Sequence, residues 1–344
     1  MPDLAHEATE KEIDRLEKKL KKEYKEATKG IEQKLNDHWK AFERKNENKL
    51  KMLADGKIDQ KEYERWRYGQ IAVGGRWEDM RRTLAEDMVN ADNIARKIVD
   101  GSKADVYALN GNFASYQIEH QASIDVGFSL YNHDAVERLL KDNPQILPPP
   151  GPKVNREVAE GKAILWNESQ IQSAVTQGIM QGMSMPELAN YIADNLGARN
   201  YNAAMRYART SMTEAQNAGR YDAFRKAKKL GVDLMIEWEA TLDNRTRHAH
   251  RQMHGQRREV DEPFETPDGY TIYYPADCSG SSDIPQNEIW NCRCTLLSWV
   301  KGYEGDTVKE SPKMGDMSFE EWQSMKQPEI NTNLRESKKK QNRH

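Results

Sequence analysis

The chain has 344 residues, and its 52 basic and 55 acidic side chains give a formal net charge of −3. Global charge therefore gives no reason to expect a nucleic-acid or membrane partner, and no apolar run reaches the ~18 residues that span a bilayer. Hydrophobic residues make up 37% and charged residues 31%, which favours elongated helices over one large globular core. The N-terminus lacks the features of a secretion signal, and the odd number of cysteines indicates a reducing compartment.

The first 60 residues mix basic and acidic side chains with apolar positions that recur every three or four residues. This spacing predicts one long helix with a narrow apolar stripe, suited to pairing with another helix. Two arrangements fit the pattern: a solvated helical hairpin within one chain, and a coiled-coil oligomer. The stripe consists of Ile13, Leu16, Leu20, Tyr24, Ala27 and Ile31.

A turn is expected at Asp55-Gly56, where the sequence looks like the second half of a calcium-binding EF-hand loop. The residues at the first and third positions of such a loop would be lysine and leucine, which supply no carboxylate oxygen. We therefore predict a simple inter-helix turn and a second helix over 61–99, with a break at Gly74-Gly75. Shorter helices are expected over 103–123 and 133–143.

A proline-rich stretch at 147–153 marks the clearest boundary, because successive prolines hold the chain extended and cannot continue a helix. Helices are expected to resume after it, the second of them starting behind Ser184, and Gly231 is a candidate left-handed cap for the last. Their expected ranges are 154–182, 185–196 and 199–230. The predicted domains are an extended helical N-terminal region (1–146), a linker (147–153), a second domain (154–300) and a polar, flexible tail (301–344).

From Leu234 onward the pattern changes to short strands punctuated by proline and glycine. Strands are expected over 234–238 and 270–274, with a short helix over 245–253 capped by Asp243 or Asn244. The predicted fold class is mainly α. Long charged N-terminal helices and a helical middle are followed by a small α+β C-terminal module with short strands.

The expected helix over 199–230 has a small-residue stripe, which predicts close approach to a neighbouring helix, and a basic polar face. Residues 199–230 carry a net charge of +6, residues 241–258 carry +4, and residues 259–290 carry −8. Two interpretations fit this pattern: the basic face neutralises DNA phosphates, or the basic and acidic blocks pair within the fold. The candidate DNA contacts are Arg206, Arg209, Arg220, Arg225 and Lys228.

Cysteine and histidine side chains are concentrated near the C-terminus, where Cys292 and Cys294 are two positions apart. Zinc takes tetrahedral nitrogen and sulfur ligands, so Cys278, Cys292, Cys294 and one of three histidines, with His250 preferred, form a candidate structural zinc site. The usual spacing of two to four residues between paired cysteines is absent, and buried thiols with hydrogen-bonded histidines explain the same cluster without metal. The other two histidines are His248 and His254.

A catalytic use of the same residues needs a positioned base and an activated nucleophile, which His250 beside Cys292 would supply. An acid/base pair of histidine with a carboxylate, as in nucleases, is a further option. The sequence contains no nucleotide-binding loop of the Walker type, no Gly-x-Ser-x-Gly and no His-Glu-x-x-His. We therefore expect no enzymatic activity and assign no catalytic or cofactor-binding residues.

Residues 160–297 resemble the C-terminal signature of tailed-phage head-morphogenesis proteins similar to phage Mu protein F. The resemblance is carried by Trp238 followed by Asp-x-Arg-Thr-Arg-x-x-His and by a terminal Asn-Cys-Arg-Cys, and the helix with Arg209-Thr-Ser-Met-Thr-Glu-Ala-x-Asn-Ala-Gly is similar to the family's lead-in. Many members have proline or an acidic residue where this chain has His248. The family-like positions are Asp243, Arg245, Thr246, Arg247, His250, Gly255, Asn291, Cys292, Arg293 and Cys294.

The resemblance implies a minor capsid protein that acts in procapsid assembly and in DNA packaging or ejection. Its implied partners are the portal protein, the major capsid or scaffolding protein, and packaged double-stranded DNA. Its implied location is the capsid interior or portal vertex of the virion, reached from the host cytoplasm during assembly. The alternative is an effector, nuclease-like or other, that is carried in the head and delivered with the genome, with the His/Cys module as its active site.

Overall fold

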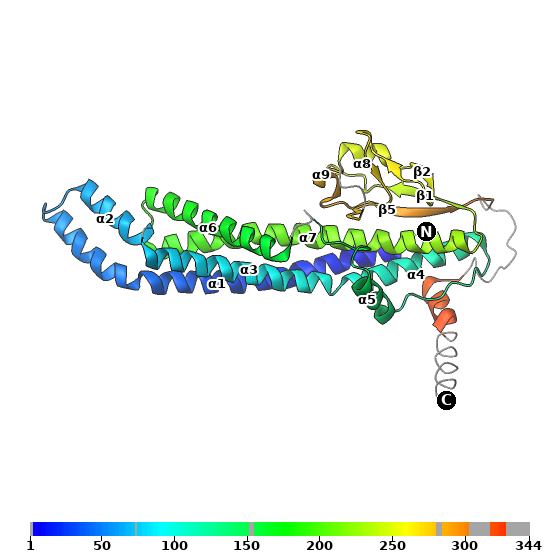
Figure 1. Cartoon of the computed structure of the whole chain (residues 1–344), viewed down its shortest axis with the longest axis horizontal. Coiled ribbons are helices and arrows are strands. Elements are labelled where there is room, and N and C mark those ends of the chain that lie inside the picture. Colours follow the sequence, from blue (N-terminus) through cyan, green and yellow to red (C-terminus); the bar gives the residue numbers. More distant parts are fainter. Residues whose placement is uncertain (1–2, 73, 151–154, 280–283, 303–316, 328–344) are drawn as a thin grey trace, which may run out of the picture. The chain divides into compact units, whose positions relative to one another are not determined.

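The computed structural model describes residues 3–72, 74–150, 155–279, 284–302 and 317–327 (Figure 1). These residues are mainly helical, with a few short strands near the C-terminus, as the sequence predicted. The chain divides into two compact units. One comprises residues 1–15, 99–151 and 206–344, and the other comprises residues 16–98 and 152–205. Among the described residues, no helix combines the length and apolar character needed to cross a membrane.

The unit of residues 16–98 and 152–205, here called the helical unit, is built from long helices. They are α1 (Leu4–Ala54, from residue 16 on), α2 (Gln60–Ala72), α3 (Gly75–Asp100, up to residue 98), α6 (Arg156–Met180) and the first part of α7 (Met185–Lys229). The predicted stripe on α1 is its core face: Leu16, Leu20 and Ile31 are fully buried. The predicted breaks are confirmed, since Gly56 and Gly74 both have positive φ angles that favour glycine.

α7 is one continuous helix, whereas the sequence predicted two helices over 185–196 and 199–230. Gly197 is responsible for the difference. It does not end the helix but permits close packing, because a Cβ at this position would lie 2.2 Å from the hydroxyl oxygen of Thr28 on α1. The start of α7 agrees with the sequence: Ser184 and Glu187 form reciprocal hydrogen bonds of the capping-box type.

The other unit, here called the head unit, contains the remainder of α1 and α7 together with α4 (Lys103–Ala122) and α5 (His133–Asp142). Its strands β1 (Leu234–Glu239), β2 (Arg257–Glu259) and β5 (Thr295–Val300) form an antiparallel sheet in the order β2-β1-β5. Two helices and a small hairpin complete this C-terminal module: α8 (His248–Met253), α9 (Gln286–Ile289), β3 (Phe264–Glu265) and β4 (Thr271–Ile272). In Figure 1 the sheet lies along the part of α7 that belongs to this unit.

Residues Thr210–Arg220 of α7 are buried without interruption, so this part of the helix is enclosed on every side. Gly219 accounts for one close approach, because a Cβ there would lie 2.3 Å from the carbonyl oxygen of Tyr107 on α4. Ala208 and Ala215, which belong to the small-residue stripe predicted on the helix over 199–230, are fully buried as well. The stripe therefore serves the close helix packing that the sequence predicted.

Part of the expected flexible tail at 301–344 is folded. Residues 319–327 form a short helix in which Trp322 is 1% exposed, stacked on Phe319 and hydrogen-bonded to Glu119 of α4. Lys326, 3% exposed, pairs with the same carboxylate at 3.2 Å. Two aromatic residues three positions apart give this segment an apolar face, which explains its packing. Residues 303–316 and 328–344, including the basic run at 338–343, lie outside the described residues, as do residues 151–153 of the predicted linker.

Candidate functional site

The side chains of the enclosed part of α7 bind the backbone of the family-like Asn-Cys-Arg-Cys segment. The hydroxyl of Thr210 accepts a hydrogen bond of 3.0 Å from the N–H of Asn291. The hydroxyl of Thr213 donates one of 2.8 Å to the carbonyl of Cys292. Asn291 itself has a φ of 55°, a left-handed conformation that asparagine tolerates better than most residues. A threonine on each of two successive helical turns thus fixes the start of the segment.

The next two turns of α7 bind the continuation of the same segment into β5. The amide of Asn217 donates to the carbonyl of Cys294 and accepts from the N–H of Leu296, both at 3.0 Å. The guanidinium of Arg220 donates to the carbonyl of Leu296 at 3.0 Å. The positions 210, 213, 217 and 220 are three or four residues apart and therefore share one helix face.

Arg220 is a structural residue and not a DNA contact, which corrects the sequence-based assignment. Its side chain is 0% exposed. It donates to both carboxylate oxygens of Asp3, at 2.7 and 2.6 Å, and to the side-chain oxygen of Asn110 at 3.0 Å. A buried guanidinium with this many acceptors is stabilised only while all of them are in place. Since Asp3 is 217 positions away, nothing local in the sequence could have indicated this partner.

The two halves of the family-like motif meet through Asp243 and Arg293, which form two hydrogen bonds of 2.7 Å. The hydrogen bonds and charge of Arg293 hold the pKa of the Asp243 carboxyl well below its usual range. The same aspartate accepts from the N–H of Arg245 at 2.8 Å, and Arg247 donates to the carbonyl of Trp290. The Asp-x-Arg-Thr-Arg turn is therefore attached to the Asn-Cys-Arg-Cys segment at two points.

This attachment explains why the expected cap of the short helix was wrong. The sequence predicted a helix over 245–253 capped by Asp243 or Asn244, but α8 begins at His248 with Arg247 as its capping residue. The Asp243 side chain is committed to Arg293 and to its own turn. Thr246 reinforces that turn by accepting from the Asp243 N–H at 2.9 Å.

His250, Cys292 and Cys294, three of the four residues of the predicted zinc site, form a buried cluster. Their ligand atoms lie within 4.8 Å of one another. The Nδ1 atom of His250 lies 3.7 Å from the sulfur of Cys292 and 3.3 Å from that of Cys294. Its other ring nitrogen lies 3.3 Å from the carboxylate of Glu288 on α9. Glu288 was not singled out from the sequence, because it is one of eight acidic residues in 259–290 and has no distinctive spacing.

The members of this cluster shift one another's pKa values. A hydrogen bond with Cys294 and the neighbouring His250 keep the pKa of the Cys292 thiol well below its usual value, against the effect of burial. Burial lowers the pKa of His250, but the hydrogen bond and charge of Cys292 outweigh it and raise the pKa overall. Exposed fractions of 4% for His250, 1% for Cys292 and 3% for Cys294 show that the cluster is closed to solvent.

Cys278 lies outside this cluster, in contrast to its predicted place in the zinc site. Its thiol donates to the carbonyl of Ala276 at 3.4 Å, and its N–H donates to the carboxylate of Glu214 at 3.2 Å. Burial raises the pKa of Glu214 to about 8, although Lys103 and the bond from Cys278 oppose the shift. Cys278 thus belongs to a second buried polar group centred on Glu214 of α7.

The other predicted residues have separate environments. His248 is exposed and bonded to Gln252, while His254 accepts from the N–H of Ala240 at 3.3 Å. Gly255 has a φ of 79°, so glycine is required for its conformation. The remaining candidate DNA contacts occupy two kinds of surroundings. Arg209 and Lys228 pair with Glu10 and Asp261, and Arg206 and Arg225 lie over the rings of Trp290 and Tyr221.

Comparison with known proteins shows a family match over this site. Residues 169–297, which run from α6 into β5, match the family described as Phage Mu protein F like protein. This segment is therefore similar to the Phage Mu protein F-like family. The Mu F-like segment contains the α7 contacts, the Asp243–Arg293 pair and the buried cluster. The resemblance noted from the sequence is therefore confirmed over nearly the whole of its expected range.

Curated relatives extend the similarity beyond the Mu F-like segment. The chain is 29% identical over 210 residues to a protein of Enterococcus faecalis named NAD(+)--arginine ADP-ribosyltransferase EFV, covering 60% of this chain and 40% of that protein. It is 26% identical over 225 residues to minor head protein GP7 of Bacillus phage SPP1, covering 65% of this chain and 67% of GP7. The chain thus spans about two fifths of the first relative and about two thirds of the second. No solved structure matches the chain.

Proposed function

We propose that the protein is a minor head protein of a tailed bacteriophage, which acts with the portal protein in procapsid assembly and in DNA packaging or ejection. The Mu F-like segment is the observation that carries this proposal, and the similarity to GP7 over 65% of the chain supports it. The major capsid or scaffolding protein is a further proposed partner. The proposed location is the virion head, at the capsid interior or portal vertex.

The geometry of the Mu F-like segment suits a structural role. Its signature residues are used to join α7, the 241–247 turn and β5 to one another, as the paired Asp243 and Arg293 illustrate. The long helices of the helical unit suit side-by-side docking to helices of another protein.

Co-assembly with the portal protein tests the proposal. The chain and the portal protein of the phage that encodes it are expressed together, and portal rings are isolated by size and affinity. We expect the chain to be recovered with the rings in a fixed ratio. Recovery of rings without the chain, under conditions in which both proteins are soluble and folded, contradicts the assembly role.

The relative named as an ADP-ribosyltransferase favours a second candidate function, an effector carried in the head. The most specific version of this hypothesis makes His250, Cys292 and Cys294 the active site. The burial of all three argues against this version, because a substrate atom has no exposed side chain of the cluster to contact. Transfer of label from NAD⁺ to a small guanidine acceptor tests the activity, with His250→Ala as the variant. We expect no transfer of label. Transfer by the unsubstituted protein that is lost in a folded His250→Ala variant would instead establish the effector function.

We also propose that His250, Cys292 and Cys294 supply three of the four ligands of a structural zinc ion. With Zn–S bonds of ~2.3 Å and Zn–N bonds of ~2.0 Å, tetrahedral nitrogen and sulfur ligands lie ~3.5 Å apart. The nitrogen–sulfur distances of 3.7 and 3.3 Å at His250 are close to this value. Glu288 on the far side of the ring suits the role of a carboxylate that orients a ligating histidine. Bound zinc would join α8 to the Cys-Arg-Cys segment.

Elemental analysis with thiol titration tests the zinc proposal. Protein purified without chelator is expected to contain about one zinc per chain, with Cys292 and Cys294 becoming reactive once the metal is removed. Cys294→Ser is expected to lose the metal. Cys278→Ser is the matched control, since its thiol lies outside the cluster, and it is expected to retain the metal. Zinc at background level in the unsubstituted protein contradicts the proposal.

DNA contact is proposed for Arg206, Arg209, Arg225 and Lys228. Arg206 and Arg225 are exposed and are the better candidates for DNA contact, because Arg209 and Lys228 already pair with carboxylates. Each phosphate contact adds about 0.9 to the slope of log affinity against log salt concentration. Arg206→Ala combined with Arg225→Ala is therefore expected to lower that slope by about two. An unchanged slope, or no binding to duplex DNA at low salt, contradicts the assignment.

A further inference from the structure

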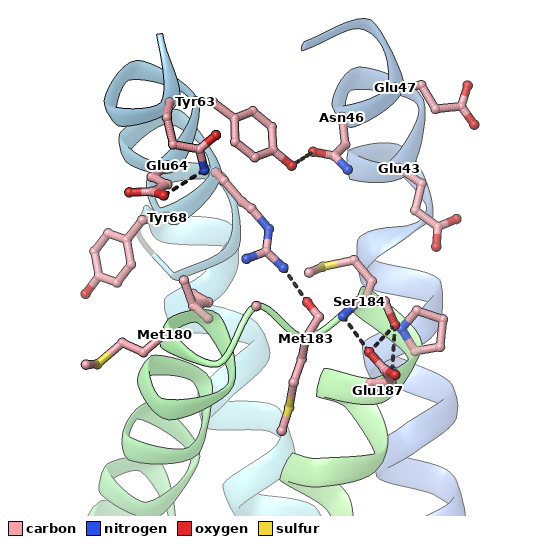
Figure 2. Close-up of a pocket in the computed structure, with 16 residues that line it drawn as sticks. Glu43, Asn46, Glu47, Tyr63, Glu64, Tyr68, Met180, Met183, Ser184 and Glu187 are labelled. Atoms are coloured by element: carbon pink, nitrogen blue, oxygen red, sulfur yellow. Dashed lines mark hydrogen bonds between the residues drawn. The ribbon is translucent and has the colours of Figure 1, made fainter. Parts of the chain in front are cut away.

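A cavity of about 1010 Å³ lies in the helical unit between α1, α2 and the turn that joins α6 to α7 (Figure 2). Its walls are held by hydrogen bonds between these elements. Tyr63 on α2 donates to the side chain of Asn46 on α1 at 2.8 Å, and Arg67 on α2 donates to the carbonyl of Met183 in the turn. The cavity is therefore a defined feature of the helical unit, here called the tip groove.

The tip groove presents apolar side chains that nothing in the described part of the chain covers. Met180, the last residue of α6, is 82% exposed, and Tyr68 on α2 is 41% exposed. Met183 and Ile179 continue this apolar lining along the turn. Methionine side chains are flexible and polarizable, and they are common on surfaces that bind helical partners of varied sequence.

The charge of the tip groove is negative. Its lining includes four glutamates, and its single cationic side chain, Arg67, is committed to the Met183 carbonyl. Two of the glutamates have local uses: Glu64 accepts from Gln60, and Glu187 caps α7 through Ser184. The other two, Glu43 and Glu47, are exposed one turn apart on α1. A cationic occupant would therefore meet acidic side chains from α1, α2 and α7.

We propose that the tip groove is a docking site for a lysine- or arginine-rich amphipathic helix of a partner protein. A helix ~10 Å wide and two turns long occupies roughly 850 Å³, which fits the volume of the groove. Apolar side chains of the partner would contact Met180, Met183 and Tyr68, while its basic residues would lie beside Glu43 and Glu47. This inference does not depend on the proposed head role, because it concerns the helical unit alone.

A designed peptide serves as the probe, because the partner is defined here only by its chemistry. A labelled peptide of about five helical turns, with leucine on one face and lysine on the other, is titrated with the full chain in a fluorescence anisotropy experiment. We expect saturable binding by one peptide per chain. The same peptide with glutamate in place of lysine is expected not to bind.

Charge reversal locates the binding to the groove. Glu43→Lys with Glu47→Lys is expected to weaken binding of the lysine peptide roughly tenfold or more, because like charges then face each other. The variant Glu26→Lys with Glu137→Lys changes the net charge equally, at exposed sites that do not line the groove, and it is expected to bind as the unsubstituted chain does. Met180→Ser, at a side chain too exposed to support the fold, is expected to weaken binding without a change in melting temperature.

Three results overturn the proposal. One is equal weakening by the control pair of substitutions, which would show attraction to global charge alone. The second is tight binding of the glutamate peptide. The third is a gain in peptide affinity when residues 328–344, which include the run Lys338-Lys339-Lys340, are removed, since that would make the chain's own tail the occupant.

Discussion

Asp243 and Arg293 are fifty positions apart in sequence and are joined by two parallel hydrogen bonds of 2.7 Å. The pair connects the turn before α8 to the segment that leads into β5. The two halves of the family-like signature, each weak as a sequence motif, are therefore the two sides of one contact. The Asn-Cys-Arg-Cys segment is therefore bound from two sides. Asp243 binds the side chain of Arg293, and side chains of α7 bind the backbone of the same segment.

Replacement of Asp243 tests the contribution of this pair. Asp243→Asn keeps the shape of the side chain but removes its charge, so the urea midpoint is expected to fall at pH 7. Because the folded state lowers the pKa of Asp243, its stabilising effect is present above the unfolded pKa of ~3.9 and disappears as the pH falls through the folded value. The deficit of the variant should therefore shrink in acid. Asp268→Asn, at an exposed aspartate of the same module, is the control, and an equal deficit there would refute the special role of the pair.

Asn217→Ala tests the contact between α7 and β5. The substitution leaves the carbonyl of Cys294 and the N–H of Leu296 buried without their partner, at a cost of about 2–5 kcal/mol in unfolding free energy. Chemical denaturation measures the loss. Asn202→Ala, at an exposed site on the same helix, should change stability by less than about 0.5 kcal/mol. Similar losses for both variants would show that Asn217 acts only through helix propensity.

Glu214 makes the unfolding free energy depend on pH in the opposite direction to Asp243. Its pKa is raised from 4.5 to about 8, so the folded state holds a proton that the unfolded state has lost between these values. Stability contributed by this group therefore falls as the pH rises from 4.5 to 8 and changes little above that. Glutamine stays neutral, so the stability of Glu214→Gln relative to the unsubstituted protein is expected to increase as the pH rises across this window. A difference in unfolding free energy that is independent of pH would contradict the burial of a protonated carboxyl.

Trp322→Ala tests the docking of the C-terminal helix. The indole donates to Glu119 at 2.5 Å and stacks on Phe319, so its loss is expected to release residues 319–327 while the rest of the head unit stays folded. Tryptic cleavage after Lys326 should then become fast, with little change in the circular dichroism spectrum. Trp166→Ala, at a tryptophan that is 44% exposed, provides the control. Persistent protection of Lys326 in the Trp322 variant would contradict the docking.

Local features of the sequence were sufficient for most of the helices. The apolar stripe from Ile13, the glycines at 56 and 74, and the capping residues at the start of α7 are each determined by neighbours within a turn or two. The exception, Gly197, has its reason in Thr28 of another helix. Sequence spacing shows that a glycine is present, but not whether it ends a helix or permits close packing.

The candidate site was predicted only in part, because its decisive contacts join distant residues. The cluster of His250 with two cysteines was expected, whereas the exclusion of Cys278 depends on its contact with Glu214 of α7. Arg220 had the charge and helical position of a DNA contact, yet its burial against Asp3 gives it a structural use. Pattern and composition identify residue types on a helix face, but the burial of that face is determined by tertiary packing.

The presence of the chain in purified heads tests the central claim most directly. Heads of the phage that encodes the protein are separated from free protein by density, and their components are quantified by mass spectrometry. A minor head protein is expected at a few copies per particle, with the same ratio after a high-salt wash. Its absence from heads, while it is present in the infected cell, would contradict the assignment.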